Sequence, residues 1–141
     1  MKNIELFDDY TAAILARLYE AFPVPISIDA RKLSGHEEVD EFGGVIDDHG
    51  QASKKFEIAI STLDWLREAG FIASHMRNQF GHSQVTLTAH GLQVLNAVPD
   101  SLKSKEPTGE KLVRLTREGS LGLVRETVKA IIAAGVNAGL S

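Results

Sequence analysis

The fold is decided by residues 56–95, which read FEIAISTLDWLREAGFIASHMRNQFGHSQVTLTAHGLQVL. In the first part of this stretch, apolar side chains recur every three or four residues, the spacing of a helix with one buried face. They are Phe56, Ala59, Ile60, Leu63 and Leu66. Gly70 follows, and glycine suits a helix C-terminus because it adopts a positive φ without strain. The sequence therefore predicts a helix that ends at Gly70.

After Gly70 the pattern changes to alternation, which predicts two β-strands joined by a polar turn. Residues 71–76 and 85–88 alternate between apolar and polar side chains. The residues between them, 77–82, are polar and include a glycine, as a hairpin loop requires. Thr88 has the hydroxyl of a helix N-cap, so we expect a short helix from there to Leu95.

The residues ahead of this stretch predict two more helices and a strand. An apolar stripe over residues 8–22 predicts a helix, with Asp8 or Asp9 as its N-cap because acids favour the positive end of the helix dipole. Residues 26–28 alternate and predict a short strand. Residues 30–33 predict a brief helix that a Ser-Gly pair ends.

The order Leu63-x-x-Leu66-x-x-x-Gly70-Phe71-Ile72, hairpin, Leu87-Thr88-x-x-Gly91-x-x-x-Leu95 resembles the core of a winged helix-turn-helix domain. The resemblance covers residues 8–98. It implies an α+β, mainly α fold, with a three-helix core, a small antiparallel β-hairpin called the wing, and additional C-terminal helices. In this family the helix that ends at Gly70 is the recognition helix, and the tip of the wing falls near residues 77–83. The resemblance also implies that the strand predicted at residues 26–28 pairs with the wing hairpin.

The resemblance implies a DNA-binding protein, a transcriptional regulator that acts as a dimer on double-stranded DNA. Such a protein anchors phosphates and reads some base edges in the major groove. The candidate DNA-binding residues are Lys54, Lys55, Ser61 and Arg67 on the recognition helix and Arg77, Asn78 and Gln79 in the wing.

The charge distribution favours a second interpretation. Residues 1–50 carry a net charge of −7, against a net charge of −4 for the whole chain. Residues 36–50 contain six acids and no Lys or Arg, where the family has a turn of three or four residues. Phosphate contacts dominate affinity for DNA, so these acids oppose DNA binding. The segment is either a solvated acidic loop or a loop that is autoinhibitory or faces a partner.

The alternative function is therefore a non-enzymatic protein–protein interaction module of winged-helix fold, which self-associates and does not bind DNA. A protein partner would then contact the acidic segment 36–50. Ile58 and Trp65 lie off the main apolar stripe, seven residues apart and so on one face of their helix. Either they pack under the N-terminal helix, or they form an exposed apolar patch for a second subunit.

The chain is predicted to divide into a winged-helix domain (1–98), a polar linker (99–107) and a C-terminal helical extension (108–141). Thr108 is the expected N-cap of the first helix in this extension. Its second helix carries an apolar stripe that we expect to pack on the domain or to form a homodimer. The stripe consists of Leu121, Val124, Val128, Ile131 and Ile132.

Several functions have no support in the sequence. There is no cysteine, so a disulfide or a thiolate metal site is excluded. The five histidines show no closely spaced pair, so no metal site is predicted. A nucleophile elbow, a phosphate loop and a dinucleotide fingerprint are absent, so we expect neither an enzyme nor a cofactor. No long apolar run or signal peptide is found, so we expect no membrane contact and a cytoplasmic location.

Overall fold

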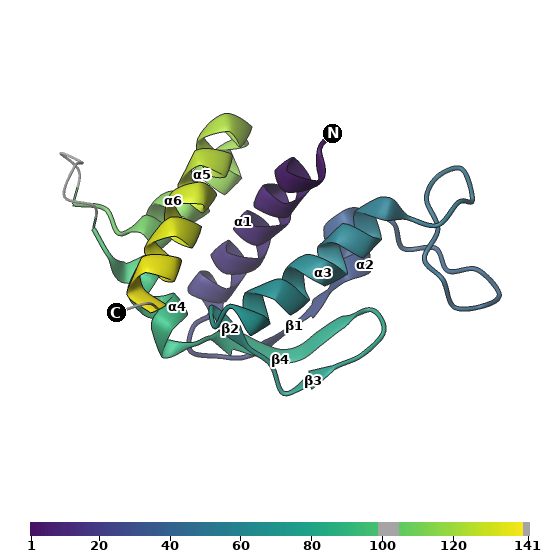
Figure 1. The fold of residues 1–141 in the computed structure, drawn as a ribbon, viewed down its shortest axis with the longest axis horizontal. Helices are drawn as coiled ribbons and strands as arrows, with labels where there is room; N and C mark the ends of the chain where they lie inside the picture. Colours follow the sequence, from purple (N-terminus) through teal and green to yellow (C-terminus); the bar gives the residue numbers. More distant parts are fainter. Residues whose placement is uncertain (99–104, 140–141) are drawn as a thin grey trace.

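The computed structural model describes residues 1–98 and 105–139 and has a mainly helical α+β architecture with a small antiparallel sheet (Figure 1). The helices in this part of the chain are α1 (Asn3–Ala21), α2 (Ala30–Ser34), α3 (Lys54–Glu68), α4 (Ala89–Asn96), α5 (Thr108–Glu118) and α6 (Leu121–Gly139). The strands are β1 (Ile26–Asp29), β2 (Ile72–Ala73), β3 (Met76–Arg77) and β4 (Gly81–Leu87).

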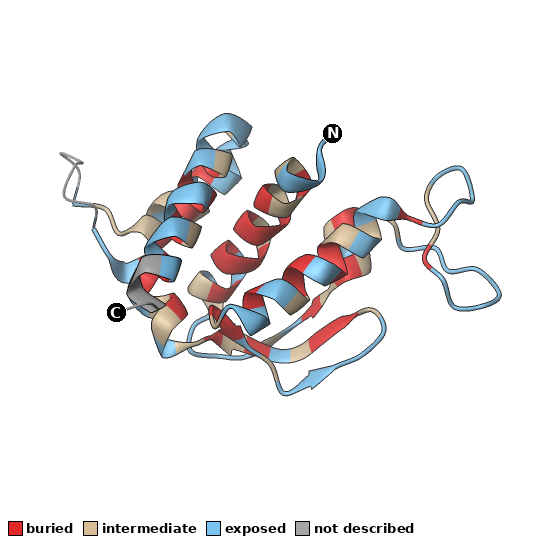
Figure 2. Ribbon diagram, viewed as in Figure 1, coloured by how far each residue is buried: buried red, intermediate tan, exposed pale blue. Residues whose placement is uncertain are grey.

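Helix α1 is the centre of the core. It lies between α3 on one side and α5 and α6 on the other, with the sheet at one end (Figure 1). Its side chains are buried along most of its length, including Ile14, Leu15 and Leu18, as the red ribbon of Figure 2 shows. Because α1 packs on both neighbours, a single hydrophobic core joins all of these helices.

Local sequence signals set the end of α3 and the start of α4 as predicted, and a cap that was not predicted sets the start of α3. The Ser53 Oγ accepts a hydrogen bond from the Phe56 N–H at 3.0 Å and so caps α3. Gly70 follows α3 with φ of +84°, which confirms the predicted glycine stop. The Thr88 Oγ1 accepts from the Gly91 N–H at 2.9 Å, which confirms Thr88 as the cap of α4.

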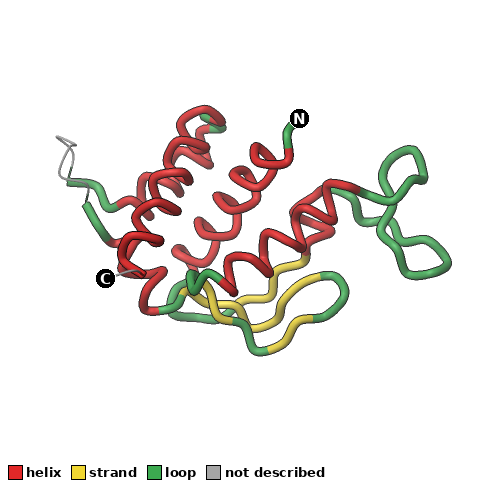
Figure 3. The backbone as a smooth tube through the Cα atoms, viewed as in Figure 1, coloured by secondary structure: helices red, strands yellow, loops and turns green. Residues whose placement is uncertain are grey.

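The sheet is built around β4, which pairs antiparallel with β1 on one side and with β2 and β3 on the other (Figure 3). Ile26 lies opposite Val85, and Ile72 lies opposite Leu87, so apolar residues face one another. The predicted pairing of residues 26–28 with the hairpin is confirmed. The predicted strand 71–76 is divided into β2 and β3, and the turn is shorter than expected because pairing extends to Arg77 and His82.

The predicted start of α1 is wrong. The helix begins at Asn3, and the Glu5 carboxylate accepts from the Lys2 backbone N–H at 2.9 Å. Asp8 therefore lies inside the helix and is only 3% exposed, and burial raises the pKa of its carboxyl. Asp9 accepts from the Arg125 guanidinium on α6 at 2.9 Å. Both acids therefore face a tertiary contact that local sequence does not reveal.

The C-terminal helices share the core of the chain. Val124, Val128 and Ile131 are buried in it, and Leu112 and Leu115 of α5 join them. Of the other predicted packing residues, Ile132 is half-buried and Leu121 is 55% exposed. Four of the five predicted residues thus pack within the chain itself, since Ile132 also packs against the core. The predicted linker falls largely on residues 99–104, which lie outside the described part of the chain.

Thr108 does not cap α5 as predicted. Pro107 occupies the N-cap position, and Thr108 is the first residue of the helix. The Thr108 hydroxyl instead donates to the Ala97 carbonyl at 3.0 Å, which ties the start of α5 to the end of α4. Because Thr108 lies inside the helix and not at the position before it, its side chain is not in the capping position.

Residues 36–52 form two loops that stand away from the body beyond α2 and the start of α3 (Figure 1). We call this segment the acidic arm. Each loop is closed by an isolated antiparallel bridge, Val39 with Val45 and Ile46 with Ala52. Val45 is 6% exposed and its carbonyl accepts from the Ser53 N–H at 2.9 Å. The arm is therefore an ordered segment held by hydrogen bonds.

Candidate interaction surface

All seven predicted DNA-binding side chains are exposed. Four of them, Lys54, Lys55, Ser61 and Arg67, lie on α3, and the others lie in the β3–β4 hairpin. Successive helix residues are rotated by about 100°, so Lys54 and Ser61, seven apart, share one face, whereas Lys55 and Arg67 fall on its two flanks. The structure therefore does not gather the four helix residues into one patch.

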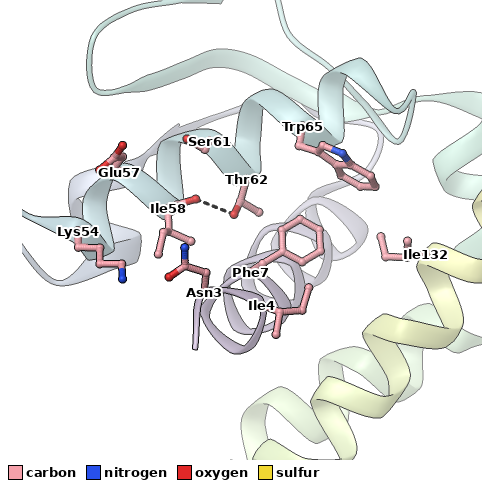
Figure 4. Close-up of a pocket in the computed structure, with 10 residues that line it drawn as sticks. All are labelled: Asn3, Ile4, Phe7, Lys54, Glu57, Ile58, Ser61, Thr62, Trp65 and Ile132. Atoms are coloured by element: carbon pink, nitrogen blue, oxygen red, sulfur yellow. Dashed lines mark hydrogen bonds between the residues drawn. The ribbon is translucent and has the colours of Figure 1, made fainter. Parts of the chain in front are cut away.

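One half of the exposed side of α3 borders a groove against α1. Figure 4 shows Lys54, Ile58, Ser61 and Trp65 along this half. Across the groove lie Ile4 and Phe7 of α1 and Ile132 of α6, and the groove has a volume of about 920 Å³. Two of the predicted DNA-binding residues, Lys54 and Ser61, thus line a mainly apolar groove.

Two aromatic rings, Phe7 and Trp65, line part of this groove. The Phe7 and Trp65 rings meet edge to face with centroids 5.4 Å apart, and Trp65 stacks on Phe71 at 6.4 Å. Trp65 nevertheless stays 41% exposed, and Ile4 is 56% exposed. Trp65 therefore fits both alternatives predicted from the sequence, since it packs beside α1 and also presents apolar surface to solvent.

The other half of the exposed side of α3 is acidic. It carries Glu57, Asp64 and Glu68, at helical spacings of seven and four residues, and Glu57 also lines the groove. Asp64 faces the hairpin, where the Arg77 guanidinium donates to its carboxylate at 3.1 Å. The predicted wing arginine is therefore already paired with an acid of the predicted recognition helix.

The buried His82 side chain completes this contact. Its Nε2 lies 2.8 Å from Asp64 Oδ1, and its Nδ1 lies 2.9 Å from the Ser74 Oγ. Burial by itself raises the pKa of Asp64, but the hydrogen bonds from Arg77 and His82 outweigh it and leave the pKa of the carboxyl below its ordinary value. Asp64 therefore fastens the hairpin to α3.

Ser74, His82 and Asp64 are the residue types of a nucleophilic triad, but their geometry differs from one. In a serine hydrolase the imidazole Nε2 faces the serine and Nδ1 faces the acid. Here Nδ1 faces Ser74 and Nε2 faces Asp64. His82 lines a polar cavity next to β1, and Ser74 is not among the residues that line that cavity. The arrangement serves to hold the hairpin.

Replacing Asp64 by Asn tests this role through its pH dependence. Because the folded-state pKa is lowered, the stabilisation is complete above the ordinary carboxyl pKa of about 4 and is lost as pH falls through the folded value. We expect Asp64→Asn to cost about 1 kcal/mol at pH 7, since solvent screens this partly exposed group. Urea unfolding should show the difference from wild type shrinking at pH 3.

Glu68→Gln is the matched control, because Glu68 is an exposed acid on the same half of α3. It should change the free energy of unfolding by less than about 0.5 kcal/mol at either pH. An Asp64→Asn effect of equal size at pH 7 and pH 3 would contradict an ionised tie between α3 and the hairpin.

A second, polar cavity of about 550 Å³ lies between α1, the start of α2 and the hairpin turn, where Asn78 and Gln79 border it. Of its cations, Arg31 is held by Asp29 at 2.8 Å and lies over the Phe80 ring at 4.0 Å. The hydrogen bond from Arg31 lowers the pKa of Asp29. The Asn78 side chain accepts from two backbone N–H groups of its own turn. Asn78 and Arg31 are therefore both engaged in local structure.

The contribution of α1 to the groove was not predicted from the sequence. Ile4 and Phe7 continue the three-and-four spacing that leads to Tyr10 and Ile14, and this extension of the stripe was the available signal. The expected start at Asp8 left both residues outside the helix. Among residues 1–98 and 105–139, no three His, Asp or Glu side chains converge in a way that could hold a metal ion.

Comparison with known proteins adds no relative. No family model, curated protein or solved structure matches the chain. None of the helices in the described part of the chain is long and apolar enough to cross a membrane. The evidence for the function is therefore the geometry of the surface around α3.

Proposed function

We propose that this chain is a non-enzymatic winged-helix module that binds protein by self-association and does not bind DNA. The order of elements supports the winged-helix assignment: α1, β1, α2, α3, the β3–β4 hairpin and then α4. In that reading α3 holds the position of the recognition helix and the hairpin that of the wing. The resemblance concerns the fold, and fold alone does not fix function.

The observation that carries the proposal is the character of the exposed side of α3. One half borders an apolar groove, and the other half carries Glu57, Asp64 and Glu68. The wing cation that would contact phosphate, Arg77, is held by Asp64. A surface that presents apolar side chains and acids suits a protein partner better than a phosphate backbone.

The acidic arm supports the same conclusion. It leaves the body next to the start of α3, the end that approaches DNA in helix-turn-helix proteins (Figure 1). Its six carboxylates would repel phosphates at that end. Lys54 and Lys55 lie directly after the arm, so their charge is outnumbered by neighbouring acids.

Two measurements on the intact chain test the proposal. Fluorescence anisotropy with a random-sequence DNA duplex should show no binding, even at low salt. Sedimentation velocity over a range of protein concentrations should show a monomer–dimer equilibrium. A protein that stays monomeric at about 100 μM, well above the dissociation constants of specific interfaces, would overturn self-association.

DNA binding is the second candidate function, and one observation favours it: all seven predicted contact side chains are exposed. The control for it is the variant Lys54→Glu/Lys55→Glu/Arg77→Glu. Salt-sensitive binding by the wild type that this variant loses would place phosphate contacts on α3 and the wing. That result would reverse the preference between the two candidates.

A further inference from the structure

The first loop of the acidic arm presents one large apolar side chain at its tip. Phe42 is 89% exposed, the highest value among the large apolar side chains of the described residues. Four acids precede it in sequence, in the run Glu37-Glu38-Val39-Asp40-Glu41-Phe42. Leaving a whole phenyl ring in water forgoes the favourable free energy of its burial, and an exposed aromatic side chain on a protruding loop is typical of a binding anchor.

The turn that carries Phe42 is held by hydrogen bonds. Asp40 Oδ1 accepts from the Phe42 N–H at 2.9 Å and from the Gly44 N–H at 2.8 Å. The Asp40 N–H donates to the Gly44 carbonyl at 2.8 Å, and Gly43 adopts φ of +82°. Because the turn is already ordered, binding through Phe42 costs little conformational entropy.

The base of the arm is also fixed to the body. The His36 imidazole is hydrogen-bonded to the Ser53 hydroxyl, which caps α3. Ile46 donates its N–H to the Glu38 carbonyl at 3.0 Å, and Val45 is buried. The arm therefore holds Phe42 at a set distance from the body, and the exposure of this ring shows that it does not fill the groove of its own chain.

The α1–α3 groove has the complementary character. Its apolar walls include Phe7, Ile58 and Trp65, which suit a phenyl ring. Helices α1 and α3 both begin at the end where Asn3 and Lys54 lie (Figure 4). Helix N-termini carry partial positive charge, and the Lys54 ammonium adds to it. Glu57, the acid that also lines the groove, is offset by these groups.

We propose that Phe42 on the acidic arm of one copy inserts into the α1–α3 groove of a second copy, with the arm carboxylates facing Lys54 and the helix N-termini. This inference rests on the proposed function and names the contact through which the chain self-associates. Each copy carries both the arm and the groove, so a two-fold pair forms the contact twice. The acidic charge of the arm then selects the end of the groove where both helices begin.

The first test compares the dimer dissociation constants of variants by sedimentation velocity. Phe42→Ala should raise the dissociation constant at least tenfold, because it removes the anchor from both contacts. Val24→Ala is the matched control, since Val24 is also an exposed apolar residue (63%) and lies outside the arm and the groove. It should leave the constant unchanged. Circular dichroism should show that both variants keep the wild-type fold.

The second test uses the absence of native cysteine to locate the contact. Phe42→Cys and Ser61→Cys are made as separate proteins, mixed and oxidised under mild conditions. A disulfide between the two proteins is expected, because Ser61 is an exposed residue of the groove. Val24→Cys replaces Ser61→Cys in the control mixture and should give far less heterodimer. Single-site proteins exclude a link within one chain.

The outcomes separate the two proposals. A dimer that Phe42→Ala does not weaken, with no preferred Phe42→Cys to Ser61→Cys link, would overturn this contact and leave self-association standing. A protein that remains monomeric throughout would overturn both. Loss of dimer in Phe42→Ala together with the preferred link supports the arm-in-groove contact.

Discussion

We expect that ending the chain at Val98 abolishes the cooperative unfolding transition. This truncation removes α5 and α6, which pack against α1 and contribute Leu112, Leu115, Val128 and other side chains to the common core. Removing a single buried Leu or Ile side chain typically costs 2–5 kcal/mol, whereas a whole domain has a stability of about 5–15 kcal/mol. Thermal denaturation followed by circular dichroism should show a broad change with no defined midpoint.

A matched pair of substitutions on α6 separates loss of packing from loss of chain length. Val128 is fully buried and Leu123 is 53% exposed, although both are apolar residues of the same helix. Val128→Asp should destabilise the protein by at least about 3 kcal/mol, because it places an unpaired charge in the core. Leu123→Asp should change the stability by less than about 1 kcal/mol. A cooperative transition in residues 1–98, with two similar α6 variants, would instead show that the extension is a separate unit.

We expect that replacing Gly91 by Ala lowers the free energy of unfolding by about 3 kcal/mol or more. A Cβ at this position would lie 2.2 Å from the Phe71 carbonyl oxygen, which is a backbone atom and cannot rotate away. Either α4 or the strand that follows α3 has to move, and the Thr88 hydroxyl that caps α4 and donates to the Phe71 carbonyl loses its geometry. Urea unfolding at pH 7 measures the difference directly.

Gly122→Ala is the control for this substitution, because Gly122 is also a helical glycine but has open space around its Cα. Alanine favours the helix more than glycine does, so this variant should gain up to about 1 kcal/mol. Opposite signs for the two variants are expected. A neutral Gly91→Ala would mean that α4 does not approach the Phe71 carbonyl as closely as described.

The sequence predicted well the features that depend on neighbours within one turn or one hairpin. The stripe from Phe56 to Leu66 set the buried face of α3, Gly70 set its end, and Thr88 set the start of α4. Alternation in residues 26–28 predicted the strand that pairs with β4. These signals succeed because capping, positive φ and side-chain periodicity are decided by residues only a few positions apart.

The candidate surface was predicted only in part, because its chemistry depends on partners distant in sequence. The sequence identified exposed cations on α3 and the hairpin, but the pairing of Arg77 with Asp64 joins residues thirteen positions apart. The placement of Lys54 beside α1 depends on a start of α1 that Asp8 and Asp9 concealed. Both acids have the chemistry of a cap. Asp8 is instead buried inside the helix, and Asp9 pairs with Arg125 of α6.

By itself, the sequence determined the order of helices and strands, the end of α3, the cap of α4 and the acidic character of residues 36–50. Only the tertiary structure decided that α6 packs on its own chain, that the exposed side of α3 divides into an apolar and an acidic half, and that Phe42 stands free. The physical reason is that local structure follows from bonded neighbours and short hydrogen bonds. Which side chains stay exposed depends on how separate helices pack together, and local patterns in a single sequence do not predict this packing.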